Sequence, residues 1–405
     1  MKGKIRFAVT QQNGFIPIKG AKIVVTGMDD TRPLAELESD EDGMTQEIEL
    51  EAPDIEYSLE PGDVKPYSEY KVFSTEQGYR ELEVEGVEIL ADRTAVLKLE
   101  MEPEQQGELT EDVLIGPHTL YGDYPPKIPE PEYKEMDESG EIVLSRVVIP
   151  ETIVVHDGAP SSNAKNYYVR YTDYIKNVAS SEIYATWPES AIYANILCIM
   201  SFTLNRVYTE WYRNKGYDFQ ITSSTAYDQK WIYGRNTYAN IDRIVDSIFN
   251  NYLSRPGVKQ PIFTSYCDGV KADCLGLKQW GSKTLADKGY SAIEIIRYYY
   301  GNDMYINSSN VVSGIPSSFP GYNLAIGSSG EKVRRMQNQL NRIARNYPAI
   351  TKVTPDGVFG KQTEQAVKDF QRIFGYPANG IVDYPTWYGI SSIFVGVSRI
   401  SEPGT

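Results

Sequence analysis

The stretch from Tyr171 to Trp211 constrains the fold of this chain more than any other. Through residues 171–183 apolar side chains recur every three or four positions, which predicts a helix with one apolar face. Pro188 stands where a second helix can begin, because proline has no N–H to leave unpaired in a first turn. Apolar residues continue through 189–211, so the second helix is long enough to be a central core helix. We therefore expect two helices joined by a tight corner.

Glu182 lies at the end of the first predicted helix, between Ser181 and Ile183, with Tyr184 and Trp187 just beyond. Apolar and aromatic surroundings disfavour the charged form of a carboxyl group and so raise its pKa. A general acid working near neutral pH needs such a shift. Spacing alone favours the simpler interpretation, a solvated glutamate at a helix end.

Charge is unevenly distributed along the 405 residues. Residues 1–150 carry 14 Lys and Arg against 34 Asp and Glu, a net charge of −20, and residues 151–405 carry +5. The absence of a basic surplus argues against a nucleic-acid-binding protein. The uneven charge fits a front segment that is physically separable from the working part. The mildly basic rear half, residues 151–405, also suits an anionic polymer substrate.

No apolar run reaches the length of a membrane-spanning helix, so we expect no membrane span. The N-terminus lacks the apolar core of a signal peptide, so a signal is either already removed or not used for export.

Cysteine and histidine are scarce. Three cysteines cannot build a disulfide framework: Cys198 is expected to be buried in the long helix, and Cys267 and Cys274 either pair or stay free. His118 lies in a Pro-rich stretch and His156 follows a strand-like run, so a zinc site of the ordinary His-rich type lacks ligands. We expect no metal and no cofactor, and chemistry carried by carboxyl groups.

The order of sequence patterns predicts a multidomain chain. Residues 1–101 contain many short β-branched runs and form an expected N-terminal β-sandwich. Residues 102–149 are acidic and rich in proline, which predicts an extended, poorly structured connector open to proteases. Residues 150–312 read as an α+β, mainly helical domain, and residues 313–323 as a linker. Residues 324–395 form a compact helical unit.

This last unit contains a short internal sequence repeat. Asp356-Gly357 and Asn379-Gly380 are each followed by an apolar residue and then by a threonine, Thr363 or Thr386, able to begin a helix. With the opening at 324–330 and the helix at 333–340, these residues resemble the three-helix peptidoglycan-binding domain found on many cell-wall hydrolases.

The middle segment resembles the catalytic domain of stage II sporulation protein D, a lytic transglycosylase. The resemblance rests on Ser181-Glu182 ahead of Trp187-Pro188, and on Gly276-Leu277-Lys278-Gln279-Trp280-Gly281. Two residues depart from that family's pattern: Met200 stands where it has an arginine, and Asp273 lies near where it has a histidine.

Together with the front β-rich part, the chain resembles the germination-specific spore cortex-lytic enzymes of the SleC type. This resemblance implies a proenzyme outside the cytoplasm, in the cortex or coat region of a spore, whose partners are the glycan strands of cortex peptidoglycan. It also implies that a subtilisin-like germination protease removes a front prodomain near residues 140–150.

The resemblance assigns Glu182 as the catalytic acid and base. A lytic transglycosylase cleaves the MurNAc–GlcNAc bond without water, by attack of the muramic C6 hydroxyl on its own C1, so one carboxyl group can serve twice. Gln279 and Trp280 are expected to position a sugar. Tyr266 and Asp268 are expected to line the cleft, and Tyr227 and Asp228 are further candidates for contact with substrate.

Two other functions stay open. A muramidase that uses water would need a second carboxylate, for which Asp268 and Asp228 are the candidates. A non-catalytic wall-binding protein is the other, kept open by Met200 and Asp273.

Overall fold

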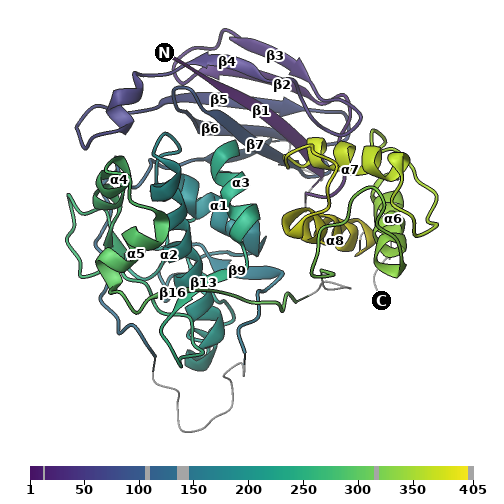
Figure 1. Ribbon diagram of the computed structural model, residues 1–405. Helices are drawn as coiled ribbons and strands as arrows, with labels where there is room; N and C mark the ends of the chain where they lie inside the picture. Colours follow the sequence, from purple (N-terminus) through teal and green to yellow (C-terminus); the bar gives the residue numbers. More distant parts are fainter. Residues whose placement is uncertain (12–13, 105–109, 135–145, 314–318, 400–405) are drawn as a thin grey trace.

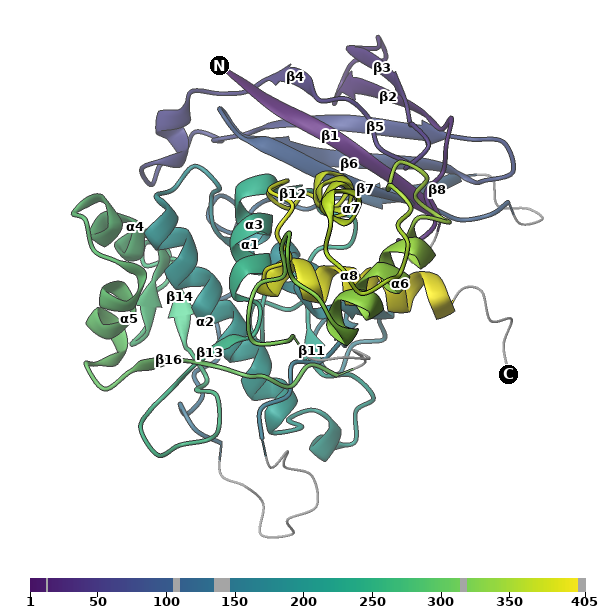
Figure 2. The ribbon, with the colours of Figure 1, turned by 45° about the vertical axis from the view of Figure 1, so that its right-hand side comes forward.

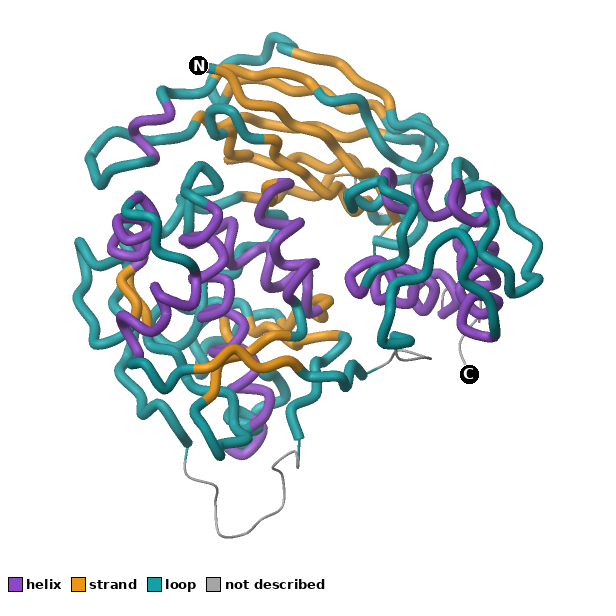
Figure 3. The backbone as a smooth tube through the Cα atoms, in the orientation of Figure 1, coloured by secondary structure: helices purple, strands orange, loops and turns teal. Residues whose placement is uncertain are grey.

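The computed structural model describes residues 1–11, 14–104, 110–134, 146–313 and 319–399. The two larger sheets form one side of the molecule, and the rest consists of helices with short strands among them (Figures 1 and 3). The described residues contain eight α-helices and strands in five sheets. The prediction of a multidomain chain with a strand-rich front and a helical C-terminal unit is thus confirmed at this level.

The front part consists of two sheets that bury their apolar faces in a common core. Along the first strand, Ile5, Phe7 and Val9 are buried while alternate residues face outward, the two-residue period of a half-buried strand. One sheet has the order β12-β7-β1-β4 and the other β3-β2-β5-β6-β8. Their strands are β1 (Lys2–Gln11), β2 (Lys22–Gly27), β3 (Ala35–Glu38), β4 (Ile48–Glu51), β5 (Ser68–Thr75), β6 (Glu81–Ile89), β7 (Thr94–Met101), β8 (Thr110–Leu114) and β12 (Thr237–Tyr238).

Two of these strands come from outside residues 1–101. Strand β8 pairs in parallel with β6, and β12 of the middle segment pairs antiparallel with β7. Of the expected connector, residues 110–114 form a strand, and residues 115–134 contain no helix or strand. Val113 is buried against the sheet, and the chain beyond it packs on the middle segment.

The middle segment is built around the predicted helix pair. Helix α1 (Tyr171–Glu182) ends at the expected residue, and α2 (Glu189–Tyr208) begins directly after Pro188, its N-cap. Almost every residue of α2 is buried, which confirms a central core helix. Around it lie α3 (Ala239–Ile248), α4 (Gln279–Asp287), α5 (Ala292–Tyr300), β9 (Thr152–His156), β10 (Asn166–Arg170), β11 (Ile221–Thr222), β13 (Asn251–Ser254), β14 (Tyr266–Cys267), β15 (Leu277–Lys278) and β16 (Tyr305–Ser308).

The C-terminal unit consists of α6 (Glu331–Ile343), α7 (Lys361–Ile373) and α8 (Tyr384–Arg399). A glutamine side chain binds the turn in each copy of the internal repeat. Gln337 of α6 accepts from Gly357 N at 2.8 Å and donates to Thr363, and Gln371 of α7 accepts from Gly380 N at 2.8 Å and donates to Thr386. The internal repeat is thus a repeated turn. In each copy one buried glutamine side chain, which we call the clamp, binds both the turn glycine and the threonine that follows.

The three parts share one continuous apolar core, which runs from Ile5 to Val397. Helices α7 and α8 lie beneath the front sheets, beside α3 (Figure 2). The ring of Phe249, just after α3, packs at an angle against the rings of Tyr384 and Tyr388 of α8. In the uncut chain the front segment therefore packs against the rest through this shared core, and its physical separability stays a prediction. None of their helices is both long and apolar enough to cross a membrane.

Candidate active site

The corner between α1 and α2 carries Glu182 into the interior, where its side chain is 3 % exposed. The two carboxylate oxygens have different partners. Oε1 accepts a hydrogen bond from the backbone N–H of Lys230 at 2.7 Å, and Oε2 accepts one from the hydroxyl of Tyr266 at 2.6 Å. Glu182 is therefore not the solvated helix-end glutamate of the simpler interpretation.

Burial raises the pKa of Glu182 above the ordinary glutamate value. The ammonium group of Lys127 and the hydrogen bonds from Lys230 N and Tyr266 act in the opposite direction, because they stabilise the carboxylate. Desolvation prevails, so the carboxyl group holds a proton at a higher pH than a solvated glutamate does. A group that can both give and take a proton needs such an environment.

Glu182 lines a small pocket open to one side. The pocket is formed by the corner, by the loop after β14, by the first residue of α4 and by residues 119–127 of the acidic segment. Its lining residues are Thr119, Gly122, Tyr124, Pro125, Pro126, Lys127, Glu182, Thr225, Tyr266, Cys267, Asp268, Lys271, Ala272 and Gln279.

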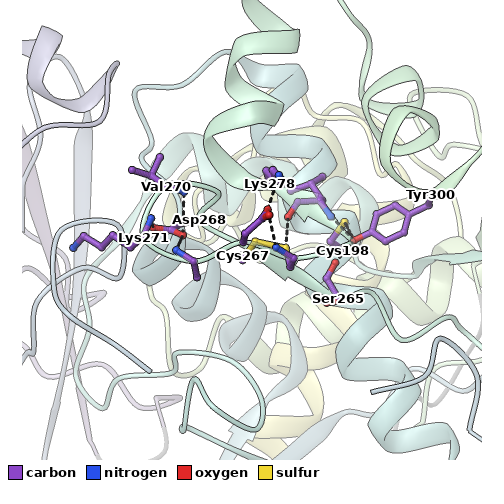
Figure 4. The surroundings of a disulfide bond; sticks show 12 residues. Cys198, Ser265, Cys267, Asp268, Val270, Lys271, Lys278 and Tyr300 are labelled. Carbon is purple, nitrogen blue, oxygen red and sulfur yellow. Dashed lines mark hydrogen bonds and ion pairs between the residues drawn. A yellow bond between two sulfur atoms is a disulfide. The ribbon is translucent and has the colours of Figure 1, made fainter. Parts of the chain in front are cut away.

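Three of the four expected substrate-binding residues lie in this lining. Tyr266 comes from β14 and holds the carboxylate directly. Gln279 opens α4 and is 4 % exposed. Asp268 follows β14, and its two oxygens accept from the N–H groups of the next turn, at Val270, Lys271 and Ala272 (Figure 4). Their roles toward substrate stay predictions.

The fourth residue, Trp280, lies behind the pocket and not in its lining. Its ring packs against Trp187 at 5.0 Å and Tyr184 at 6.0 Å between ring centroids, and it is 8 % exposed. Trp187 in turn donates its indole N–H to Ser58 O of the front part. The indole of Trp280 therefore supports the corner that carries Glu182.

Cys267 and Cys274 form a disulfide, which settles the alternative left open by the sequence. The bond closes the loop that carries Asp268 at the edge of the pocket (Figure 4). Cys198 is a buried free thiol in α2, as expected, and burial raises its pKa to about 12.

Asp228 is excluded as a second pocket carboxylate by its partners. One oxygen pairs with Arg206 at 2.7 Å, and the other accepts from the hydroxyl of Tyr212 at 2.6 Å and from Thr222. Its side chain is fully buried and does not line the pocket, so it orders the polar loop before β12.

The remaining titratable candidates lie elsewhere. His156 bonds to Asn166 and stacks on Phe219, and His118 is buried against Tyr184. Across the described ranges no three His, Cys, Asp or Glu side chains come together in a way that could hold a metal ion.

Sequence reasoning missed the pocket residues Thr119, Tyr124 and Lys127. They belong to the Pro-rich segment that was expected to be a connector, and they form one wall of the pocket. Lys230 was also missed, because its backbone N–H, not its side chain, binds the carboxylate, and a backbone donor leaves no signal in the residue type.

Comparison with known proteins identifies one part of the chain. Residues 329–388 match the family model of a peptidoglycan binding domain. The chain therefore carries a peptidoglycan-binding domain that contains the two clamped turns, and this indicates a role at the cell wall and glycan as a binding partner. No curated protein matches the sequence.

Three solved structures are each similar to about a quarter of the chain, at TM-scores below 0.2. The Bacillus anthracis TIE protein is 18% identical, with 25% of this chain and 16% of that chain covered and a TM-score of 0.17. Hydroxyquinol 1,2-dioxygenase from Pseudomonas putida is 14% identical, with 26% and 57% covered and a TM-score of 0.19. GBS52, a minor pilin of Streptococcus agalactiae, is 14% identical, with 27% and 48% covered and a TM-score of 0.18. The chain spans less than two thirds of each of these proteins.

Proposed function

We propose that this chain is a lytic transglycosylase that degrades spore cortex peptidoglycan during germination and is stored as a proenzyme. The observation that carries the proposal is Glu182, a buried carboxyl group with raised pKa at the base of a pocket, held by Tyr266 and a backbone N–H. The peptidoglycan-binding domain supports it by bringing the pocket to a wall glycan.

In the proposed reaction Glu182 first gives its proton to the glycosidic oxygen as the bond from that oxygen to C1 of the muramic sugar breaks. The resulting carboxylate then takes the proton of the C6 hydroxyl while O6 bonds to C1, which leaves a 1,6-anhydro end and consumes no water. Tyr266 and the Lys230 N–H stabilise the carboxylate between the two transfers, because both donate to it. Gln279 lies where its amide can bond to a sugar hydroxyl.

The test is digestion of purified cortex with identification of the products by mass spectrometry. We expect 1,6-anhydromuramic ends from the wild-type protein and a loss of at least about a hundredfold in rate for Glu182→Gln, the usual scale for removing a general acid. Glu189→Gln is the matched control, because this glutamate is 72% exposed at the start of α2. Normal release of muropeptides by Glu182→Gln would contradict the assignment of Glu182 as the acid, and no release by the wild-type protein would favour a non-catalytic wall-binding protein.

A muramidase is the second candidate, favoured by one observation: Asp268 shares the pocket with Glu182. In that reaction Asp268 would activate a water, and reducing ends would replace anhydro ends in the same digest. Loss of reducing ends in Asp268→Asn would support this candidate.

The proenzyme part of the proposal includes removal of the front part by a subtilisin-like germination protease near residues 140–150. Residues 140–145 of that region lie outside the described residues. The acidic front part and its contacts beside the pocket support storage in an inactive form. Equal lytic rates before and after cleavage would remove this part of the proposal.

A further inference from the structure

Residues 117–134, which we name the strap, cross the mouth of the pocket with little secondary structure of their own. At one end the strap is tied to the residue before the candidate acid. Thr119 donates to Ser181 O through its backbone N–H at 3.0 Å and its hydroxyl at 3.1 Å. On the opposite rim Lys271 donates to the backbone oxygens of Tyr121 and Gly122, both at 2.7 Å.

The middle of the strap delivers a cation into the pocket. The ammonium group of Lys127 lies 4.7 Å from the ring centroid of Tyr266, donates to Asp228 O, and lines the same pocket as Glu182. The following residue, Ile128, donates its N–H to Ala226 O at 2.7 Å. The strap therefore occupies the space next to the carboxyl group that a substrate would have to enter.

Two acidic side chains anchor the far end. Glu130 forms a two-pronged pair with Arg206, at 2.7 and 2.8 Å. Glu132 pairs with Arg255 at 2.9 Å, and its backbone oxygen accepts from Phe263 N at 2.8 Å. Paired bonds between a guanidinium and a carboxylate are the arrangement by which arginine recognises carboxylates in general.

A second hollow continues from the pocket beneath the strap. It shares Lys127, Tyr266 and Cys267 with the pocket and extends past Arg255 to Tyr299 and Tyr300. Together the two hollows form one groove, which begins at Glu182 and has the strap along one wall. Lys271 lines its first part, and Arg255, Tyr299 and Tyr300 line its second part. Arg206 is buried behind Glu130, which itself lines the second part.

We propose that this groove binds the substrate strand, and that Arg206, Arg255 and Lys271 bind the carboxylates and carbonyl oxygens of its peptide stems. The strap occupies their place in the uncut chain. Glu130 and Glu132 stand in for two stem carboxylates, and the backbone oxygens at 121 and 122 stand in for peptide oxygens. This inference rests on the proposed function for the identity of the substrate, since peptidoglycan joins an uncharged sugar chain to anionic peptides.

Charge supports this assignment over a bare sugar chain. The strap satisfies the three cations with two carboxylates and two backbone oxygens, which are the groups that a peptide stem offers. Removal of the strap would leave Arg206 with Asp228 and Arg255 with Asp303 as remaining carboxylate partners. Each guanidinium would then keep N–H groups free to bind a ligand.

The first experiment weakens the strap in the full-length protein. In Glu130→Gln/Glu132→Gln, we expect about a tenfold gain in binding of soluble, stem-bearing muropeptide chains, which corresponds to about 1.4 kcal/mol. Hydrogen exchange at the amides of Thr119 and Ile128 should accelerate in parallel. The matched control is Glu47→Gln/Glu49→Gln, which makes the same change of charge at exposed ion pairs of the front sheets. Faster exchange without any gain in binding would overturn the proposal.

The second experiment tests the cations. The strap-weakened protein Glu130→Gln/Glu132→Gln serves as the parent, and Arg255→Gln and Lys271→Gln are each added to it and compared with it. Binding is measured with glycan chains that keep their stems and with chains from which an amidase has removed them. We expect the strap-weakened parent to prefer the stem-bearing chains about tenfold and each added substitution to remove most of that preference, the scale of one charged hydrogen bond. An unchanged preference in both variants would overturn the proposal.

These readouts separate the two proposals. If no form of the protein cleaves peptidoglycan, the proposed reaction fails, while a gain in stem-dependent binding still supports the groove. If cleavage is found but stem preference does not depend on Arg255 or Lys271, the groove assignment fails and the reaction stands.

Discussion

At the residue scale, the protonation of Glu182 depends on a balance between burial and its hydrogen-bond donors. The hydroxyl of Tyr266 lowers the pKa of Glu182 because it binds the carboxylate. Tyr266→Phe should therefore raise this pKa further. A general acid is active while protonated, so the decline in lytic rate at high pH should move to higher pH in this variant. The pH–rate profile of kcat checks the shift.

The same profile needs a control for changes in packing. Tyr174→Phe removes another buried hydroxyl, which donates to Gln229 at 3.0 Å and not to Glu182. The decline of kcat at high pH in Tyr174→Phe should therefore occur at the same pH as in the wild-type protein. A limb that moves equally in both variants, or to lower pH in Tyr266→Phe, would contradict the hydrogen-bond argument.

The sequence was sufficient to predict an apolar and aromatic environment for Glu182, but not to predict which distant side chains share its pocket. Glu182 stands beside aromatic residues that are its neighbours in the chain, so its environment could be predicted locally. Lys127 reaches the same pocket from 55 positions away, through a Pro-rich segment without periodicity. The order of that segment comes from long-range pairs such as Glu130–Arg206, which no local pattern encodes.

At the element scale, the two turns of the peptidoglycan-binding domain depend on their glutamine clamps. Gly357 and Gly380 adopt φ of +80° and +75°, which other residues rarely adopt, and each N–H is bound by a buried glutamine. Gln337→Leu leaves a buried N–H and Thr363 without that partner. We expect a loss of about 1–3 kcal/mol in unfolding free energy, measured by urea unfolding, together with weaker wall binding.

Gln362→Leu serves as the control, because this glutamine is exposed and bonds only to Lys352 O at 3.0 Å. It should cost less than about 0.5 kcal/mol, as a surface substitution. The sequence predicted the turns and the threonines from residue types. It did not predict the clamps, because each glutamine lies in a helix that precedes its turn in the chain. Gln337 is 20 positions before Gly357, and Gln371 is 9 positions before Gly380.

The disulfide loop at the pocket edge is a second element with a measurable role. The Cys267–Cys274 bond closes a short loop, and chain entropy gives such a crosslink about 2–3 kcal/mol. Reduction should free the loop that carries Asp268 and raise KM more than it lowers kcat. Cys198 does not complicate the measurement, because burial raises its pKa to about 12 and keeps it unreactive. An unchanged KM after reduction would show that the loop has no role in binding.

At the scale of the whole molecule, the shared core predicts what a single cut will do. The front part contributes β7 to a pair with β12, and Ser58 accepts from Trp187 within the same interface. Cleavage at an engineered site in residues 135–145 should therefore leave two fragments that elute together in size-exclusion chromatography. Fragments that separate without denaturant would contradict the continuous core. Fragments that elute together would mean that one cut does not by itself remove the front part, so that activation would require the strap to leave the pocket while the front sheets stay bound.

The buried pair between Glu88 of β6 and Arg235 is the strongest polar bond across this interface. Both guanidinium nitrogens bind the carboxylate, at 2.5 and 2.6 Å, and both side chains are almost fully buried. Arg235→Met removes one partner and strands a buried carboxyl group, which costs about 3–5 kcal/mol. Glu88→Leu/Arg235→Met removes both charges and should cost clearly less. Urea unfolding followed by tryptophan fluorescence measures the difference.

The pH dependence of this pair distinguishes lost charge pairing from lost packing. Burial raises the pKa of Glu88 from 4.5 to about 7. A carboxyl group with a raised pKa contributes its full stability below pH 4.5 and loses it as the pH rises through about 7, because the folded state then holds an unfavourable buried charge. Without Arg235 to offset that charge, the urea midpoint of Arg235→Met should fall more steeply than wild type between pH 5 and 8. The double variant has no carboxyl group at this position, so its urea midpoint should not show this additional fall with pH. If the midpoints of the single and double variants fall equally with pH, the loss of stability in Arg235→Met comes from packing and not from the unpaired charge.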